Sequence, residues 1–163
     1  MTVDLSWLAR YRSSEPHFGL ERMEALLALR GNPHLACPVI HLAGTNGKGS
    51  TLAHLRSLLE AKELRVGVFT SPYLVSFNEQ ISIDGIPISD RDVETYLFLY
   101  QELLAKNSSD QTLRGLTEFE LMTVMAFDYF AAKKPDVVVM EVGMGGRLDS
   151  TNVCQPILTA ITT

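Results

Sequence analysis

The chain has 163 residues and is 46% hydrophobic, so it can bury one sizeable core and has the length of a single domain. It has 14 Lys and Arg residues and 19 Asp and Glu residues. The resulting net charge of −5 excludes the basic field that favours nucleic-acid or membrane binding. We therefore expect small-molecule partners. Because there is no 18-residue apolar run and no apolar signal core in residues 1–12, we predict a cytoplasmic protein. Cys37 and Cys154 have no metal-ligand spacing and are expected to be reduced thiols.

Helical and strand patterns alternate along the sequence, which predicts an α/β fold with a mainly parallel sheet covered by helices on both faces. An Asp-Gly pair at 84–85 indicates a hairpin at the sheet edge. In chain order, the predicted elements are a helix at 20–30, a strand at 39–43, a helix at 48–62, a strand at 66–69, hairpin strands at 80–83 and 86–88, helices at 89–106 and 118–133, and strands at 137–140 and 156–163.

A glycine-rich segment lies between the first predicted strand and the next helix: Gly44, Thr45, Asn46, Gly47, Lys48, Gly49 and Ser50. Small residues let backbone N–H groups turn toward phosphate oxygens, and the N-terminus of the following helix adds its dipole. Lys48 supplies a positive charge for the β- and γ-phosphates. The pattern G-x-x-x-x-G-K-[ST] is altered, because Leu42 replaces the first glycine and Gly49 follows the lysine. An ordinary turn is the alternative; we predict a variant phosphate-binding loop for ATP.

Two predicted helices begin with capping signals. Ser89 is the expected N-cap of one, while Thr117 and Glu120 form a capping box at the start of the other. The helix at 118–133 has little polar face, so we expect it to be largely buried. The polar segment 107–115 is the best candidate for local disorder. Structural roles are expected for the four histidines, which show no metal-ligand spacing: His17, His34, His41 and His54.

An acidic residue follows a buried strand pattern further along the chain. The apolar run 137–140 ends in Glu141, and a carboxylate at the carboxyl end of a strand lies beside a phosphate loop in α/β folds. Since magnesium prefers hard oxygen ligands and keeps several waters, we predict that Glu141 binds magnesium. The alternative is a solvated residue at a strand end. The glycines Gly143, Gly145 and Gly146 are expected to let a ligand approach the backbone closely.

The segment 44–50 resembles the phosphate loop of the folylpolyglutamate synthase and dihydrofolate synthase family, a branch of the Mur-type ATP-dependent amide ligases. Three further segments, at 19–22, 70–74 and 141–152, resemble the same family and occur in its order. The resemblance extends from Glu15 to Thr163. It implies the fold of the central domain of Mur ligases, incomplete at the C-terminus.

The resemblance also implies roles for individual residues. Ser71 corresponds to a serine that reaches the magnesium ion. Two positions depart from the family, since Tyr73 stands where histidine is common and Gln80 stands where arginine is usual; a glutamine cannot make a bidentate ionic contact. The residues that match the family's contacts to a pterin-bearing substrate are Gly19, Leu20, Glu21, Arg22, Thr117, Glu118, Phe119, Glu120, Leu148, Asp149 and Ser150.

The implied reaction joins L-glutamate to a carboxylate of dihydropteroate or of a folate. The carboxylate takes the γ-phosphoryl group of ATP, and the amine of glutamate attacks the acyl phosphate, with Lys48 and magnesium neutralising charge. Whether dihydropteroate, a folate or both are used stays open, because both bind through the same pterin contacts.

The strand pattern at 156–163 stops without a turn. We therefore expect residues 1–163 to be the N-terminal part of an ATP-binding domain, without the C-terminal glutamate-ligase domain and without turnover on its own; the full-length enzyme is expected to be a monomer. Two alternatives are a nucleotide-binding module without turnover and another Mur-type amino-acid ligase. The segment 117–120 and the serine-proline pair at 71–72 argue against the second alternative.

Overall fold

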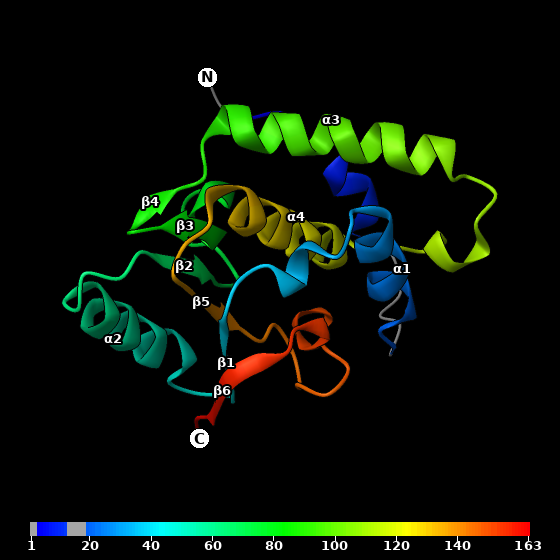
Figure 1. Ribbon diagram of the computed structural model, residues 1–163. Coiled ribbons are helices and arrows are strands. Elements are labelled where there is room, and N and C mark those ends of the chain that lie inside the picture. Colours follow the sequence, from blue (N-terminus) through cyan, green and yellow to red (C-terminus); the bar gives the residue numbers. More distant parts are fainter. Residues whose placement is uncertain (1–2, 13–18) are drawn as a thin grey trace.

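The computed structural model describes residues 3–12 and 19–163 (Figure 1). In this part of the chain, six strands form one sheet in the order β4-β3-β2-β5-β1-β6. Strands β2, β5, β1 and β6 are parallel, and β3 and β4 extend one edge as an antiparallel hairpin. The strands are β1 (Val39–Ala43), β2 (Val66–Phe69), β3 (Ile81–Ile83), β4 (Ile86–Pro87), β5 (Val137–Glu141) and β6 (Pro156–Ile161). The predicted α/β fold with a mainly parallel sheet is confirmed.

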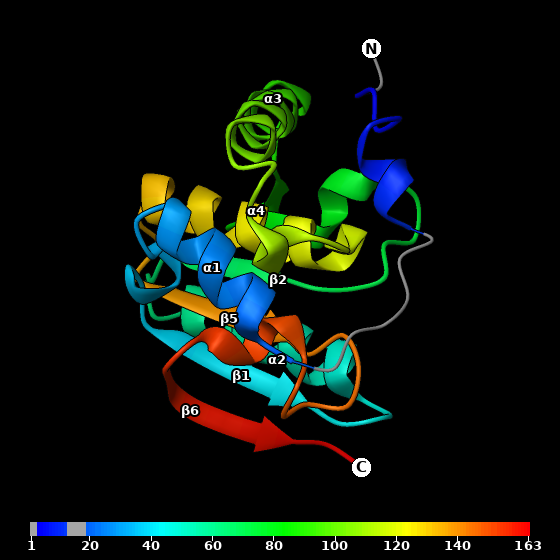
Figure 2. The same ribbon diagram turned by 90° about the vertical axis from the view of Figure 1, so that its right-hand side faces the viewer.

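Helices cover both faces of the sheet, as predicted (Figures 1 and 2). The helix α2 packs on one face through Leu52, Leu55 and Leu59. On the other face α4 lies against the strands, α1 lies beside α4, and α3 lies on the outer side of α4. The bounds are α1 (Glu21–Leu29), α2 (Lys48–Glu60), α3 (Asp90–Lys106) and α4 (Glu118–Lys133). This double cover explains why the central strands β2 and β5 are buried along their whole length and read as continuous apolar runs.

The helix α4 forms because its first turn is capped and its side chains are almost entirely apolar. Thr117 Oγ1 accepts a hydrogen bond from the Glu120 amide, and the Glu120 carboxylate accepts one from the Thr117 amide, so the predicted capping box is present. Most of the helix is buried between the sheet and α3. This places the start of α4, at Thr117, beside the carboxyl ends of the strands.

Residues 107–115 differ from the prediction of local disorder. They contain a 3-10 turn, Gln111–Leu113, whose first amides are capped by Asp110. Leu113 is buried and anchors the segment in the core beside α1. The prediction relied on the polar composition of this segment and overlooked Leu113. One buried apolar side chain is enough to fix a short loop. Within the described residues, none of the helices is both long and apolar enough to cross a membrane.

Candidate functional site

The glycine-rich segment leaves β1 at the carboxyl edge of the sheet and leads into α2. Gly44 and Gly47 have φ values of 134° and 78°, a region that favours glycine. A Cβ atom on Gly44 would lie 2.1 Å from Oγ1 of Thr162, so a side chain there would collide with the segment that follows β6. Residues 45–47 and 49–50 are exposed, and the loop therefore presents its outer surface to ligands.

Two loop residues have partners within the protein. Lys48 Nζ donates to the carbonyl oxygen of Gly44 at 2.9 Å, and it lies 3.8 Å from Oε1 of Glu141. The Asn46 amide donates to the carbonyl oxygen of Thr163 at 2.6 Å. We expected Asn46 and the loop amides to bind phosphate; in the structure the Asn46 amide holds the loop against the segment that follows β6. The side chain of Lys48 is mostly buried, with an exposed fraction of 16%.

Glu141 lies close to Lys48 because β5 pairs directly with β1, with Glu141 opposite Leu42. The residue is 5% exposed, and the Thr70 hydroxyl donates a hydrogen bond to its Oε2. Ser71, the next residue, is half-buried at the end of β2. Among residues 3–12 and 19–163, no group of three His, Cys, Asp or Glu side chains could hold a metal ion. One carboxylate beside hydroxyl groups is a donor set that fits magnesium, which keeps waters and takes phosphate oxygens.

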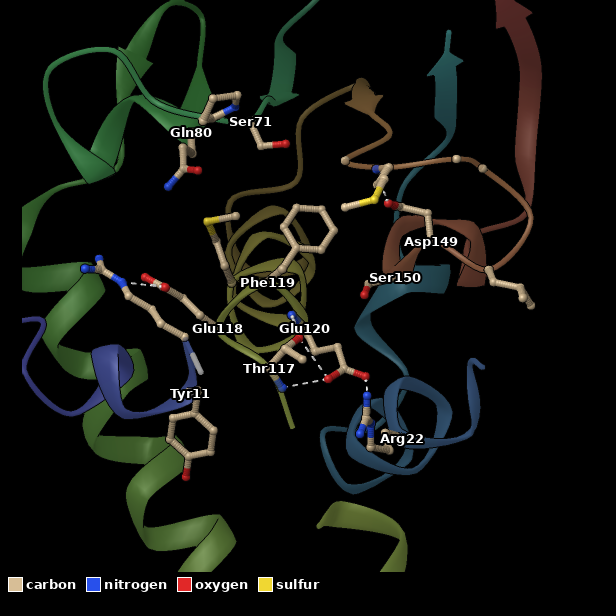
Figure 3. Close-up of a pocket in the computed structure, with 18 of the residues that line it drawn as sticks. Tyr11, Arg22, Ser71, Gln80, Thr117, Glu118, Phe119, Glu120, Asp149 and Ser150 are labelled. Carbon is tan, nitrogen blue, oxygen red and sulfur yellow. Dashed lines mark hydrogen bonds and ion pairs between the residues drawn. The ribbon is translucent and has the colours of Figure 1, made fainter. Parts of the chain in front are cut away.

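A large pocket of about 1160 Å³ opens beside this edge of the sheet. In Figure 3 the ring of Phe119 lies in the middle of the pocket wall, with Ser71 and Gln80 on one side and Asp149 and Ser150 on another. The lining residues are Tyr11, Arg12, Arg22, Ser71–Tyr73, Gln80, Thr117–Glu120, Met122 and Gly143–Ser150. The predicted segments 117–120 and 148–150 and the metal-ligand candidate Ser71 are therefore brought together, although they come from distant parts of the sequence.

Two ion pairs shape the pocket wall. Arg22 Nε donates to Glu120 Oε1 at 3.0 Å, and Arg22 Nη1 donates to the carbonyl oxygen of Gly115 at 2.7 Å. Nearer the mouth, Arg12 Nε donates to Glu118 Oε2 at 2.7 Å. Hydrogen bonding to Glu118 raises the pKa of the Arg12 guanidinium. Since Arg22 and Glu120 satisfy each other inside the wall, they define its shape more than they offer free charge.

Other predicted residues lie elsewhere. Gly19, Leu20 and Glu21 do not line this pocket; Glu21 lies at a smaller cavity of about 270 Å³ together with Arg22 and the turn at 111–114. The phosphate loop at 44–50 also lies outside the pocket lining. The structure thus separates a loop that could hold phosphates from a pocket that could hold an organic substrate.

The three glycines after Glu141 do not share one role. A Cβ atom on Gly143 would lie 2.5 Å from the ring of Phe119, so Gly143 is small because it packs against that ring. Because Gly143 also lines the pocket, this packing contact is an additional reason for a glycine beside the predicted close approach of a ligand. Gly145 and Gly146 have φ values of 74° and 149°, and a Cβ atom there would meet nothing within 4 Å. They are needed for backbone conformation, and they leave the loop open toward the pocket.

No protein-family model matches the chain. The chain is 51% identical, over 147 residues, to the dihydrofolate synthase/folylpolyglutamate synthase of Bacillus subtilis (strain 168), and the match covers 88% of this chain and 34% of that protein. The crystal structure of folylpolyglutamate synthase from Thermotoga maritima superimposes with a TM-score of 0.87 at 39% identity, over 96% of this chain and 36% of that one. A complex of FPGS with AMPPCP and folate gives a TM-score of 0.86 at 37% identity, over 98% and 40%.

The chain belongs to the folylpolyglutamate synthase and dihydrofolate synthase family. It spans about a third of the length of the curated relatives that it matches.

The two departures from the family both lie at the pocket. Gln80 is 3% exposed, and its Nε2 donates to the carbonyl oxygen of Phe77 at 3.3 Å, within its own turn. Tyr73 is half-exposed at the mouth, and its ring packs edge-on against Phe77 with centroids 6.4 Å apart. Gln80 ends a turn, Phe77–Gln80, that is held by a capping box of Ser76 and Glu79, and Tyr73 lies before this turn. The Glu79 carboxylate also accepts hydrogen bonds from the amides of Leu74 and Val75, so it fixes the loop that leads into the turn.

Sequence reasoning missed the N-terminal wall of the pocket. Residues Leu8–Tyr11 form a 3-10 turn in which Leu8 is fully buried and Tyr11 packs against Trp7 with ring centroids 5.0 Å apart. The signal was the pair Leu8 and Tyr11 at a spacing of three residues, which puts an anchor and a lining residue on one face. The partner of Arg12, at Glu118, lies 106 residues away, and no local pattern could have indicated it.

The histidines lie outside both the loop and the pocket lining, apart from His17, which falls outside the described residues. His41 Nε2 lies 2.7 Å from Thr151 Oγ1, and His54 Nδ1 lies 2.7 Å from the carbonyl oxygen of Ser50, so both have the structural partners that we expected. His34 packs edge-on against Phe127, but its Nδ1 has no hydrogen-bond partner among the described residues. Burial lowers the pKa of both His34 and His41.

Proposed function

We propose that this chain is the N-terminal part of the ATP-binding domain of an ATP-dependent ligase. The ligase would add L-glutamate to a folate, to dihydropteroate or to both through an acyl phosphate. The observation that carries the proposal is the position of Ser71. It follows Thr70, the partner of Glu141, and it also lines the large pocket. A carboxylate held in that pocket would meet the γ-phosphoryl group at Ser71.

The phosphate loop and Lys48 would bind the triphosphate. Lys48 Nζ lies between the Gly44 carbonyl and Glu141, where a compact ammonium group can contact phosphate oxygens without leaving the loop. The start of α2 adds amide groups that no intrahelical bond satisfies. ATP binding is known for relatives, since one FPGS structure contains AMPPCP and folate.

Magnesium would be held by Glu141 and Ser71, together with phosphate oxygens and water. When bound, the ion neutralises charge on the transferring phosphoryl group. The Thr70 hydroxyl occupies one carboxylate oxygen of Glu141 and leaves Oε1 on the side of Lys48. The carboxylate is thus oriented by the protein for a ligand on the phosphate side.

The pocket suits a flat aromatic acid. Phe119 offers a ring on which a pterin can stack, and Thr117, Glu118 and the backbone of the glycine loop offer polar contacts at the edge. We propose that the pterin lies against Phe119 with its carboxylate directed toward Ser71. Asp149 and Ser150 would contact the same substrate from the opposite wall.

The glutamate site and a second magnesium ligand would come from the remaining two thirds of the length of the relatives. We therefore propose that the 163-residue chain binds nucleotide without turnover. From composition we propose a cytoplasmic location and no nucleic-acid partners, and for the longer enzyme we propose a monomeric state.

Consumption of ATP tests the proposal. In an enzyme that carries this sequence and has the length of its relatives, ATP hydrolysis should require both L-glutamate and a pterin-bearing acid. Parallel assays with dihydropteroate and with folylmonoglutamate identify the substrate. The 163-residue chain should bind AMPPCP but consume no ATP. ATP consumption by the longer enzyme that is independent of both acids would reject the ligase proposal.

A further inference from the structure

A chain of buried hydrogen bonds runs from the strand that carries the phosphate loop to the wall of the pocket. His41, on β1, has its Nε2 atom 2.7 Å from Thr151 Oγ1, and Thr151 Oγ1 lies 2.5 Å from Asp149 Oδ1. The three residues are 4%, 0% and 7% exposed. Three polar side chains buried in contact with one another are costly unless each is satisfied, so their geometry is closely constrained.

The direction of these bonds follows from the groups involved. A carboxylate only accepts hydrogen bonds, so the single hydroxyl proton of Thr151 points to Asp149. The oxygen of Thr151 then accepts from His41, which requires the ring proton of His41 to be on Nε2. Burial lowers the pKa of His41 and thus favours the neutral ring with one proton. Each of the two hydrogen bonds that join His41, Thr151 and Asp149 therefore has one assigned donor proton.

At its other end, this series of hydrogen bonds holds the glycine loop, residues 143–147. Asp149 Oδ2 accepts a hydrogen bond from the Met144 amide at 2.8 Å. The Asp149 amide donates to the Gly146 carbonyl at 3.0 Å, and Asn152 Nδ2 donates to the Arg147 carbonyl at 2.9 Å.

Residues 143–147 gain little from packing on their outer side. Met144 is 79% exposed, and the positions of Gly145 and Gly146 border open space. Apart from the contact of Gly143 with Phe119, the loop is tied to the protein through residues 149–152. That segment is itself attached to β1 through Thr151 and His41.

We propose that His41 and Thr151 are positioning residues for the substrate pocket. They hold Asp149, and through it the Met144 amide, so that the glycine loop keeps the shape that receives the pterin-bearing acid. This inference rests on the proposed function, because it assigns the pocket to that substrate. His41 lies three residues before Gly44, so the same strand would set both the phosphate loop and the pocket wall.

Substitution of Thr151 tests the proposal in the longer, active enzyme. Thr151→Val removes the hydroxyl at nearly constant volume, and it should raise KM for the pterin-bearing acid about tenfold while KM for ATP changes less than twofold. Thr151→Ser keeps the hydroxyl and should stay within twofold of the unmodified enzyme. The matched control is Thr123→Val, because Thr123 is also 0% exposed and its hydroxyl donates only within α4, to Phe119 O at 2.7 Å.

Hydrogen–deuterium exchange gives a readout that needs no turnover. In the 163-residue chain, the peptide that contains Met144 should exchange at least tenfold faster in Thr151→Val than in Thr151→Ser, while peptides from α3 stay unchanged. If Thr151→Val does not fold, His41→Phe and His41→Gln test the same bond from the other side, since only glutamine retains an N–H donor. Glutamine should then preserve slow exchange and phenylalanine should not.

The outcomes separate this proposal from the proposed function. Unchanged exchange at Met144, or an unchanged KM for the acid in Thr151→Val, overturns the positioning role. An unmodified enzyme that shows no ATP consumption dependent on a pterin-bearing acid overturns the proposed function, whereas the exchange experiment still decides whether His41 and Thr151 hold the loop.

Discussion

Lys48 and Glu141 carry opposite charges 3.8 Å apart at the edge where β1 and β5 end. Each is mostly buried, with side-chain exposures of 16% and 7%, so solvent screens their charges only in part. A phosphate group at this edge would meet the ammonium directly and the carboxylate only through a cation. The two residues therefore suggest different experiments.

Lys48→Ala should reduce ATP-dependent ligation at least a hundredfold in the longer enzyme. Loss of one well-placed charge on a transferring phosphoryl group costs about 3 kcal/mol of transition-state stabilisation. Lys48→Arg should also fail, because a planar guanidinium does not replace a compact ammonium in a tight loop. Steady-state kinetics measure both effects. Turnover near that of the unmodified enzyme in either variant contradicts the role of the loop.

Glu141→Gln should raise the magnesium concentration needed for half-maximal activity and lower the maximal rate. Glutamine keeps the shape and the oxygen that Thr70 contacts, but it removes the charge that attracts the ion. Magnesium titrations at two pH values check this. If Glu141 instead acted as a base, the magnesium requirement would stay the same and one limb of the pH profile would disappear.

Single residues also show what a sequence cannot reveal. The position of Lys48 at the start of a helix after a loop could be predicted, because neighbouring glycines mark that loop. The ion pair of Arg22 with Glu120 spans 98 residues, and either partner alone looks like a solvated or capping side chain. Likewise Gly143 is small because of Phe119, a contact that appears only after folding.

Helix α3 is attached to α4 through a buried polar contact. The Tyr100 hydroxyl donates to Asp128 Oδ2 at 2.8 Å, and Arg30 Nε donates to the same oxygen at 2.9 Å. Tyr100 is fully buried. Tyr96 stacks on Tyr100 with ring centroids 6.3 Å apart, which supplies a matched aromatic control on the same helix.

Tyr100→Phe should lower the free energy of unfolding by about 2 kcal/mol, the usual range for a buried hydrogen bond to a charged group. Tyr96→Phe should lower it by less than about 0.5 kcal/mol, because this change leaves the Asp128 bonds intact. Urea denaturation of both variants of the 163-residue chain measures the difference. Equal losses in the two variants would mean that the Tyr100 hydroxyl contributes nothing specific.

Helices and strands were predictable where the sequence contains both an apolar pattern within the element and a residue that marks its end. The bounds of β1, β2 and α4 agree with prediction, because apolar runs end at glycine or polar residues and α4 has its capping box. The helices α1 and α2 are each two residues shorter than predicted. Helix ends without side-chain caps, such as those of α1 and α2, carry no such marker.

Across the whole molecule, two histidines link stability to pH: His41, which is buried, and His34, which is half-buried. Burial lowers the pKa of His34 and His41, so the folded state binds fewer protons than the unfolded state once the pH falls below about 6.5, the ordinary histidine value. Stability should therefore fall between pH 7.5 and 5.5, until the pH passes below the lowered values and the folded state is protonated as well. Urea unfolding at several pH values measures this slope.

His41→Gln should reduce that slope, since glutamine does not titrate but can still donate to Thr151. A slope identical to that of the unmodified chain would show that His41 titrates normally in the folded protein. Leu58→Gln, which alters an exposed position on α2, is the control and should leave the slope unchanged.

The assembled pocket was only partly predictable. The segments 117–120 and 148–150 were placed there by resemblance, and the structure does bring them together around Phe119. Arg12 could not be placed, because its partner Glu118 lies 106 residues away, and the spacing of Leu8 and Tyr11 does not show which surface their turn packs on. Fold class follows from pattern, whereas the lining of a cavity follows from contacts between distant segments.

The contact between the loop at residues 44–50 and the segment after β6 affects when this loop can adopt its final structure during synthesis. The Thr162 amide donates to Ala43 at 2.8 Å, and the Thr163 carbonyl accepts from Asn46, across a separation of 119 residues for the first pair. A ribosome that adds 5–20 residues per second needs about 6–24 s to make that stretch. During this interval the loop lacks the segment that it packs against. Residues 44–50 are thus synthesised well before the contacts that complete their packing can form.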